Sequence, residues 1–244
     1  PVTVPTQDMI LGAYYLTMII EGEKGEGNYY SSKEEAVIAY ENKELGMHAK
    51  IHVRMYREID GEMRSKTVET TVGRLIYNEG IPQDLGFVDR ENPETAFEPE
   101  LNFTVSKKNL GKIIEKCINK HGLSEAAVLL DYIKATGFKY STTGAITVSV
   151  DDVKVPPAKK DILAAANEEV NNVLKQYKRG LITEEERYQS VINIWEKATD
   201  KVTGAMKDNF DDLNPVYMMS QSGARGNINQ LRQIAGMRGL MAST

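Results

Sequence analysis

The chain has 244 residues, 41% of them hydrophobic and 27% charged, which suffices for one large or two modest domains with a buried core. Its formal net charge of -5 argues against a uniformly basic nucleic-acid-binding protein, and no apolar run reaches the roughly 18–20 residues of a membrane-spanning helix. The single cysteine, Cys117, excludes an internal disulfide and agrees with a reducing, cytoplasmic location.

Two helices are predicted near the N-terminus. The apolar stretch at 6–20 favours a buried helix with Thr6 as its N-cap and Asp8 in the first turn, where the helix dipole favours a carboxylate. A polar, glycine-spaced loop separates it from a short helix at 33–44, which Gly46 is expected to end.

A β-hairpin is expected next. Residues 47–56 alternate between apolar and polar side chains, which is typical of a half-buried strand, and 66–72 form the return strand after a turn at Gly61. His48 and His52 fall on the polar, exposed face of the first strand, roughly 13 Å apart at about 3.3 Å per residue. Since no cysteine or carboxylate cluster completes a ligand set, the sequence favours a polar strand face over a metal site.

The middle of the chain predicts a long polar connection followed by two helices. Residues 83–105 form the connection and end in a short strand-like LNFTV segment. The helices span 107–121 and 123–136, separated by Gly122, and residues 136–157 have a β-like pattern. The residues predicted to be buried are Leu110, Ile113, Ile114 and Cys117 in the first helix, and Ala127, Leu130, Ile133 and the stem of Lys134 in the second.

Asp151 and Asp152 are adjacent acids near the end of this segment. Neighbouring residues of a strand point to opposite faces, so the two carboxylates do not converge on one substrate. The pair is therefore expected in a turn or a helix cap rather than in general acid–base catalysis.

Residues 158–210 change to a helical repeat. Apolar residues recur at spacings of three and four on both sides of Gly180, and Thr183 with Glu186 forms a capping-box pattern that restarts a helix. The sequence thus predicts two long amphipathic helices in an antiparallel coiled-coil hairpin, joined by a turn at 178–182. Such a hairpin is either a structural coiled coil or a docking post with an exposed charged tip. The charged residues of that tip are Lys178, Arg179, Glu184 and Glu185.

The C-terminal segment is basic, although the chain as a whole is acidic. It carries Arg225, Arg232 and Arg238, and no Asp or Glu occurs from Leu213 to Thr244. This asymmetry points to a polyanionic partner. The Gly-Ala-Arg-Gly turn at 223–226 precedes a helical pattern, so it is either a phosphate site or a tight turn whose arginine pairs with a surface acid.

Long stretches of this chain resemble the β′ large-subunit family of bacterial RNA polymerase. The run YMMSQSGARGNINQLRQIAGMRGLM (217–241) is similar to the F-loop segment of that family, and 168–206 resemble the rim helices at the mouth of its secondary channel. Weaker similarity reaches back to the PTQDMILG run that begins at Pro5. The resemblance implies an α+β fold with a pore-like domain at 1–157, a funnel and rim-helix hairpin at 158–212, and an F-loop segment at 213–244.

The resemblance also implies roles for particular residues. Arg225 would reach the triphosphate of the incoming nucleotide, which suits a guanidinium because it is always charged and donates two bonds to phosphate. Gln7 would line the path by which substrates enter. The rim tip, which includes Tyr188, would dock Gre-type cleavage factors. Gln189 and Ser190 replace an Asn-Lys pair that helps some family members bind the alarmone ppGpp, so that site is not expected here. The expected F-loop residues are Gln230, Arg232, Gln233 and Arg238.

The family's catalytic centre is expected to lie outside this chain. The resemblance implies that Mg²⁺ is held by three aspartates in an NADFDGD loop, and no such triplet occurs here. We therefore expect no catalytic residue, metal or cofactor in this fragment, which alone would be inactive. Both ends look cut from a longer polypeptide.

The implied partners are the rest of β′, the β, α and ω subunits, nucleoside triphosphates, RNA and DNA, in a nucleoid-associated cytoplasmic complex without a membrane. The alternative is a freestanding coiled-coil module that binds protein or nucleic acid, although the sequence shows no aromatic-basic face to support it.

Overall fold

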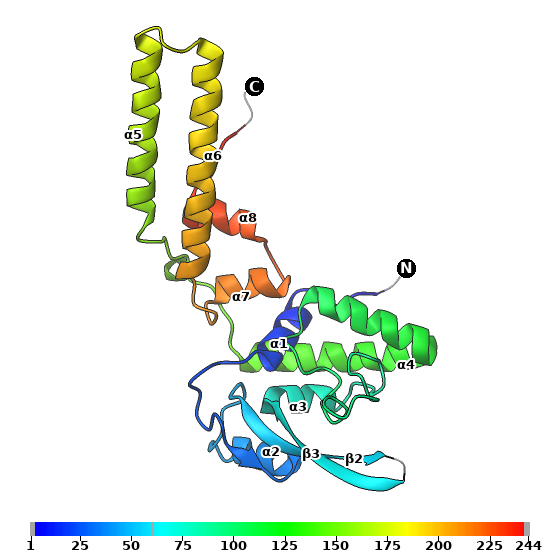
Figure 1. Cartoon of the computed structure of the whole chain (residues 1–244). Coiled ribbons are helices and arrows are strands. Elements are labelled where there is room, and N and C mark those ends of the chain that lie inside the picture. Colours follow the sequence, from blue (N-terminus) through cyan, green and yellow to red (C-terminus); the bar gives the residue numbers. More distant parts are fainter. Residues whose placement is uncertain (1–2, 60, 242–244) are drawn as a thin grey trace. The chain divides into compact units, whose positions relative to one another are not determined.

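The computed structural model describes residues 3–59 and 61–241 and divides the chain into two compact units (Figure 1). One unit comprises Pro1–Ile146 with Ser222–Ala224, and the other comprises Thr147–Gln221 with Arg225–Thr244. Helices predominate beside one small sheet, so the predicted α+β class is confirmed.

The first unit combines a helical core with a three-stranded sheet. Its elements are α1 (Asp8–Thr17), β1 (Tyr29–Tyr30), α2 (Lys33–Glu41), β2 (Ile51–Ile59), β3 (Glu62–Thr70), α3 (Val72–Asn78) and α4 (Lys107–Thr143). Apolar residues of α1 and α4 form the main core, among them Ile10, Leu16, Leu110, Ile113 and Ile133.

The helices α1 and α4 approach each other closely at a pair of glycines. A Cβ atom on Gly12 would lie only 1.8 Å from the carbonyl oxygen of Gly137, so no larger residue fits there without backbone movement. At its start, α1 differs from the prediction. Gln7, with φ of 47°, is the N-cap and makes no side-chain bond, whereas Thr6 contributes only its carbonyl, which accepts from the Met9 N–H at 3.1 Å.

Gly122 breaks α4 into two arms, as predicted, because its φ of 82° and ψ of -176° are not helical. The four residues predicted to be buried in the first arm are all buried. In the second arm the predicted register is partly wrong. Ala126 and Leu129 are buried together with Ile133, whereas Ala127 and Lys134 are exposed and Leu130 is only partly buried.

The β-like interpretation of 136–157 is wrong, because α4 continues to Thr143. Thr136, Gly137 and Tyr140 are buried at helical spacing, and Gly137 permits the contact with α1. A local pattern rich in threonine and glycine thus yields to tertiary packing. Within 144–157 the described structure has a single 3-10 turn, η1 (Val150–Asp152).

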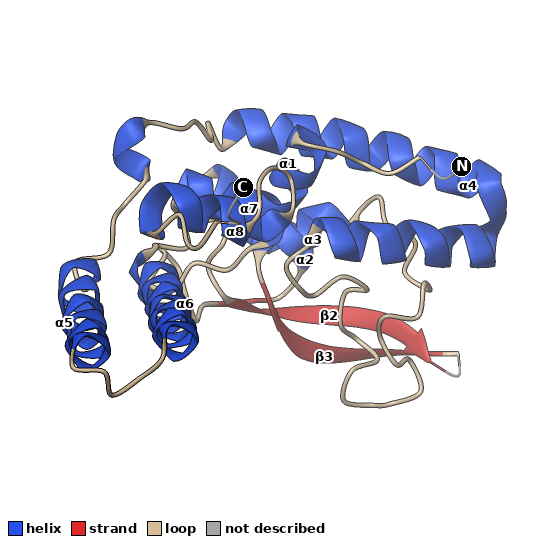
Figure 2. Ribbon diagram, turned by 90° about the horizontal axis from the view of Figure 1, so that it is seen from above, coloured by secondary structure: helices blue, strands red, loops and turns tan. Residues whose placement is uncertain are grey.

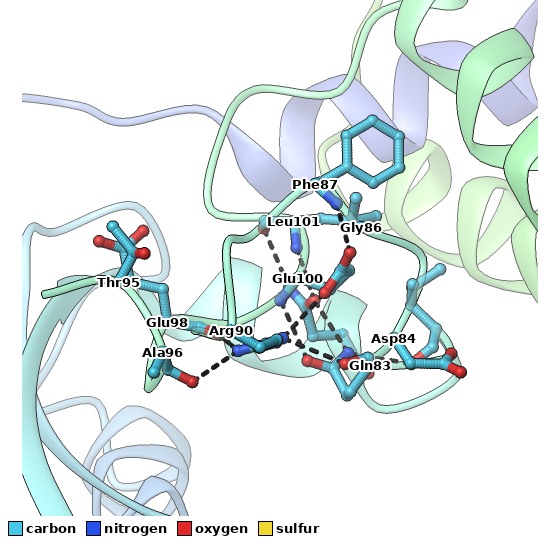
Figure 3. A network of polar contacts seen from close by, with 12 residues as sticks. Gln83, Asp84, Gly86, Phe87, Arg90, Thr95, Ala96, Glu98, Glu100 and Leu101 are labelled. Atoms are coloured by element: carbon cyan, nitrogen blue, oxygen red, sulfur yellow. Dashed lines mark hydrogen bonds and ion pairs between the residues drawn. The ribbon is translucent and has the colours of Figure 1, made fainter. Parts of the chain in front are cut away.

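The connection at 83–105 is ordered by buried polar groups rather than by secondary structure (Figure 3). Glu100 is fully buried, accepts from the Phe87 N–H at 2.6 Å and pairs with Arg90 Nη2 at 2.8 Å. Arg90 Nη1 also donates to the carbonyls of Ala96 at 2.9 Å and Glu98 at 2.7 Å. The Arg90–Glu100 ion pair therefore joins two parts of the 83–105 connection to each other.

The predicted strand at LNFTV is also absent from this connection. Its backbone groups bond to side chains instead, since the Leu101 N–H donates to Asn78 Oδ1 at 2.9 Å and the Val105 N–H donates to Thr17 Oγ1 at 2.8 Å. These acceptors replace the neighbouring strand that a β-ladder needs.

The predicted β-hairpin is confirmed. Strands β2 and β3 pair antiparallel around Gly61, whose φ of 79° suits a glycine turn. Ile51, Val53 and Val68 are buried on one face. The sequence did not indicate β1, which adds to β2 in parallel register with Tyr29 opposite His52.

His48 does not lie on the exposed strand face, so that prediction is wrong. The strand begins only at Ile51, and His48 is 2% exposed in the core, edge-on to the Tyr15 ring. Neither ring nitrogen reaches a partner with normal hydrogen-bond geometry in the described residues. Burial lowers the pKa of His48 to about 4, and the Met18 backbone opposes this shift only in part.

The second unit is built on the predicted helical hairpin, which is confirmed. Helices α5 (Lys159–Lys178) and α6 (Glu184–Asn209) run side by side (Figures 1 and 2). The capping box that starts α6 is also confirmed: the Thr183 N–H donates to Glu186 Oε2 at 2.8 Å, and the Glu186 N–H donates to Thr183 Oγ1 at 3.2 Å.

A small core anchors the base of this hairpin to the C-terminal segment. Met206 and Phe210 of the hairpin pack against Leu231 and Ala235. The predicted cap role of the aspartate pair is confirmed at Asp152, whose carboxylate accepts from the Ser149 N–H at 2.6 Å. The remaining elements are α7 (Pro215–Ser222), α8 (Ile228–Leu231) and the π-turn η2 (Arg232–Gly236). Within the described residues, no helix combines the length and hydropathy needed to cross a membrane.

Candidate phosphate site and hairpin tip

The Gly-Ala-Arg-Gly turn presents Arg225 between two glycines with left-handed backbones. Gly223 has φ of 75° and Gly226 has φ of 77°, conformations that glycine adopts without steric cost. The Arg225 N–H donates to the Met219 carbonyl at 3.2 Å, which ties the turn to α7. The backbone of Arg225 is therefore fixed while its side chain is exposed.

A capping box follows the turn immediately. The Gln230 N–H donates to Asn227 Oδ1 at 2.9 Å, and the Asn227 N–H donates to Gln230 Oε1 at 3.1 Å. Gln230, expected as an F-loop residue, thus starts α8 and fixes the exit of the turn. Because α8 has only four residues, its dipole is weak, and the Arg225 side chain supplies the main positive charge of the turn.

A pocket of about 420 Å³ lies beside Arg225. Gly226, Gln230 and Gln233 also line it, whereas Arg232 and Arg238 do not. Its walls are largely apolar and include Met219, and no Asp or Glu lines it. Within the described residues no ion pair neutralises Arg225. The surface-acid alternative for this arginine therefore has no support in the described part of the chain.

The other two arginines of the segment lie in different surroundings. Arg232 is half-buried, and its Nε is buried with no hydrogen-bond partner in the described region. Arg238 is exposed. Gln7 belongs to the other unit and is exposed at the start of α1. Val148 also lines the pocket, and sequence reasoning missed it because nothing in a single apolar loop residue marks it as a site.

All the residues predicted to form the hairpin tip are exposed, namely Lys178, Arg179, Glu184, Glu185 and Tyr188. Glu184 is engaged locally. Arg187 Nε donates to Glu184 Oε2 at 2.9 Å, and this hydrogen bond lowers the pKa of that carboxyl.

Sequence reasoning missed Leu181, which is 69% exposed at the turn of the hairpin. An apolar residue next to the turn glycine, Gly180, was the available signal. The tip thus combines exposed charges with an exposed apolar side chain.

Metal ligands do not gather in the described part of the chain, where no three His, Cys, Asp or Glu residues converge. His48 is enclosed in the core, and the His52 ring stacks on Tyr29 at 4.4 Å between centroids.

Two family models match this chain. RNA polymerase Rpb1, domain 3, matches residues 1–153, and RNA polymerase Rpb1, domain 4, matches residues 182–244. The chain belongs to the RNA polymerase Rpb1 family. The resemblance inferred from the sequence motifs is therefore confirmed.

Bacterial members of the Rpb1 family are similar to the chain over its whole length. It is 58% identical over 244 residues to the DNA-directed RNA polymerase subunit beta' of Acetivibrio thermocellus, covering 100% of this chain and 21% of that relative. Identity to the same subunit is 55% over 243 residues in Clostridium beijerinckii (100% and 21%) and 55% over 242 residues in Thermoanaerobacter sp. (99% and 20%). The chain thus spans about a fifth of the length of these relatives.

The Rpb1 domain-4 match contains both the Arg225 turn and helix α6. Residues 154–181, which include all of α5, lie outside both family models but inside the alignment with the relatives.

Proposed function

We propose that this chain is part of a β′ subunit and lines the secondary channel of a DNA-directed RNA polymerase. Residues 1–157 form the pore-like part, 158–212 the rim hairpin and 213–244 the F-loop segment. Nucleotides enter and backtracked RNA leaves along this wall. The catalytic Mg²⁺ and its aspartates belong to other parts of the larger subunit, so the fragment alone has no polymerase activity.

The observation that carries this proposal is the unneutralised guanidinium of Arg225 on a fixed turn within a member of the Rpb1 family. A triphosphate offers pairs of charged oxygens that match the fork of an arginine, and a fixed turn reduces the entropy lost when they bind. Gln230 and Gln233, with Arg232 and Arg238 nearby in sequence, form the rest of the F-loop segment, and Gln7 lines the path of the nucleotide.

Replacing Arg225 tests the nucleotide contact in the intact polymerase. We expect Arg225→Ala to raise the apparent KM for nucleotides by an amount worth ~1.5–3 kcal/mol, because a charged hydrogen bond is lost. Arg225→Lys should fall between the wild type and alanine, since it keeps the charge and loses the fork. The measurement is steady-state extension of a fixed primer-template at varied nucleotide concentration.

Arg64→Ala is the matched control, because Arg64 is exposed on β3 and forms a surface ion pair with Glu62 at 3.6 Å. Nucleotide kinetics of Arg225→Ala that equal those of Arg64→Ala would reject the triphosphate role.

The hairpin tip is proposed to dock Gre-type secondary-channel factors through Lys178, Arg179, Glu184, Glu185 and Tyr188. The double change Lys178→Glu with Arg179→Glu should weaken binding of such a factor to the intact polymerase about tenfold or more, ~1.4 kcal/mol, because two exposed cations are reversed. The same reversal at the base of α5, Lys159→Glu with Lys160→Glu, is the control. Equal affinities of the tip and base variants would exclude docking at the tip.

A further inference from the structure

The open face of the β2–β3 sheet carries aromatic and cationic side chains that the function proposed above does not use. His52, Arg54 and Tyr56 alternate along β2 and so share one face, opposite the buried face formed by Ile51 and Val53. Tyr29 of β1 lies beside His52 in register and stacks on it, with ring centroids 4.4 Å apart at 19°. The sequence did not reveal this face, because the pairing of β1 with β2 was not predictable from it.

The rings of this face are open to solvent. Tyr29 is 74% exposed and Tyr56 is 56% exposed, and both are accessible to a flat ligand. Along β2, Tyr56 lies four residues from His52, a separation of ~13 Å, with Arg54 midway between them. The order along the strand is therefore aromatic, cation, aromatic.

The charge of Arg54 is free to meet a ligand. Within the described residues no ion pair or hydrogen bond engages it, and its cross-strand partner is Thr67. Tyr56 faces Ser65 across the strands. Two carboxylates share this face: Glu69 is the cross-strand partner of His52 and pairs with Lys50 at 3.5 Å, and Glu58 follows Tyr56 along β2, opposite Met63.

We propose that this sheet face binds single-stranded nucleic acid, with one base on the Tyr29–His52 stack, one on Tyr56, and the intervening phosphate on Arg54. Unpaired bases stack on aromatic rings, and a cation between the rings holds the backbone. A duplex hides the faces of its bases, so only a single strand fits. Most neighbours of the rings are hydroxyls and charges, with Met63 as an exposed apolar exception near Tyr56, and this polar surround favours nucleic acid over a protein partner.

Fluorescence anisotropy of a labelled six-residue oligouridylate with the full 244-residue chain tests this proposal. Tyr56→Ala and Tyr29→Ala should each weaken binding at least about fivefold, the lower end of the measured range for one lost base stack. Tyr56→Phe should bind like the wild type, because the ring and not the hydroxyl makes the contact. Arg54→Ala should weaken binding and reduce the slope of affinity against salt by about one counterion.

Phe138→Ala is the matched control, since Phe138 is an aromatic residue 45% exposed on α4 and lies outside this face. It should leave the affinity unchanged, whereas the same oligonucleotide paired with its complement should bind more weakly, because pairing hides the faces of its bases. Wild-type affinity in both tyrosine variants would overturn the proposal and assign the exposed rings to a protein contact. Loss of binding with Arg225→Ala alone would overturn it as well, because the oligonucleotide would then sit on the C-terminal segment.

Discussion

Replacement of Glu100 by alanine is expected to lower the free energy of unfolding by about 3–5 kcal/mol, the cost of breaking a buried ion pair on one side. The carboxylate is 0% exposed, and Figure 3 shows Arg90 and the Phe87 backbone converging on it. Without it, the Phe87 N–H loses its acceptor and the Arg90 guanidinium keeps its carbonyl partners but loses its counter-charge, in a site where little water can replace it.

The network around Glu100 also fixes the path of the chain. The Glu100 N–H donates to Gln83 Oε1 at 3.0 Å, and Gln83 Nε2 donates to the Ile81 carbonyl at 2.9 Å. These backbone bonds remain in the alanine variant, but loss of the carboxylate removes its bonds to Phe87 and Arg90 and so loosens the 83–105 connection. Because this connection also supplies Leu101 and Val105 to the main core, the loss should appear as global destabilisation.

Urea denaturation of the chain is the measurement. Glu91→Ala is the control, because Glu91 is an exposed acid of the same loop and should change stability by less than about 0.5 kcal/mol. The double variant Arg90→Met with Glu100→Leu should lose less unfolding free energy than the two single variants lose together, because it leaves no buried charge without its partner. A Glu100→Ala chain as stable as Glu91→Ala would show that the pair does not hold the loop.

Acidification from pH 6.5 to pH 4 is expected to destabilise the chain through His48 by up to about 3 kcal/mol. The pKa of this buried ring is lowered from 6.5 to about 4, so in this window the unfolded chain takes up a proton that the folded chain does not. The contribution of the neutral His48 ring to the free energy of unfolding is therefore fully present above pH 6.5. It decreases as the pH falls and is lost near pH 4.

Unfolding free energies at several pH values between 4 and 7 test this dependence. His48→Phe should flatten the curve, because a ring without nitrogens has no proton to gain and leaves no buried nitrogen without a partner. His121→Gln is the control, since His121 lies outside this core and contacts Asp84 at 2.8 Å. If the unfolding free energy has the same slope against pH in the wild type and in His48→Phe, then His48 does not cause the acid destabilisation.

The sequence predicted those elements whose signals are local. The capping residues Thr183 and Glu186, the break at Gly122 and the turn at Gly61 depend on neighbours within a few positions, and each was found where expected. The motif at 217–241 indicated the family because a motif is recognised from the linear order of its residues, without knowledge of their positions in space.

For the candidate site, the sequence identified Arg225 and its turn but not the surroundings of the guanidinium. The tie to the Met219 carbonyl, the pocket and the inclusion of Val148 all depend on where α7 and the loop before η1 lie in the second unit. The separate positions of Arg232 and Arg238 likewise follow from packing, because all three arginines look alike along the chain.

By itself, the sequence determined the family, the helical hairpin, the β-hairpin and the charged turn, because periodicity, capping and glycine conformation are properties of short segments. Only the tertiary structure decided that His48 is buried, that α4 runs past Gly137, that Glu100 closes its loop and that Tyr29 stacks on His52. The physical reason is the same in all four cases. Burial, close backbone contact, ion pairing and stacking each require a partner that lies at least eight positions away along the chain. That separation exceeds about two helical turns, so local sequence patterns do not report it.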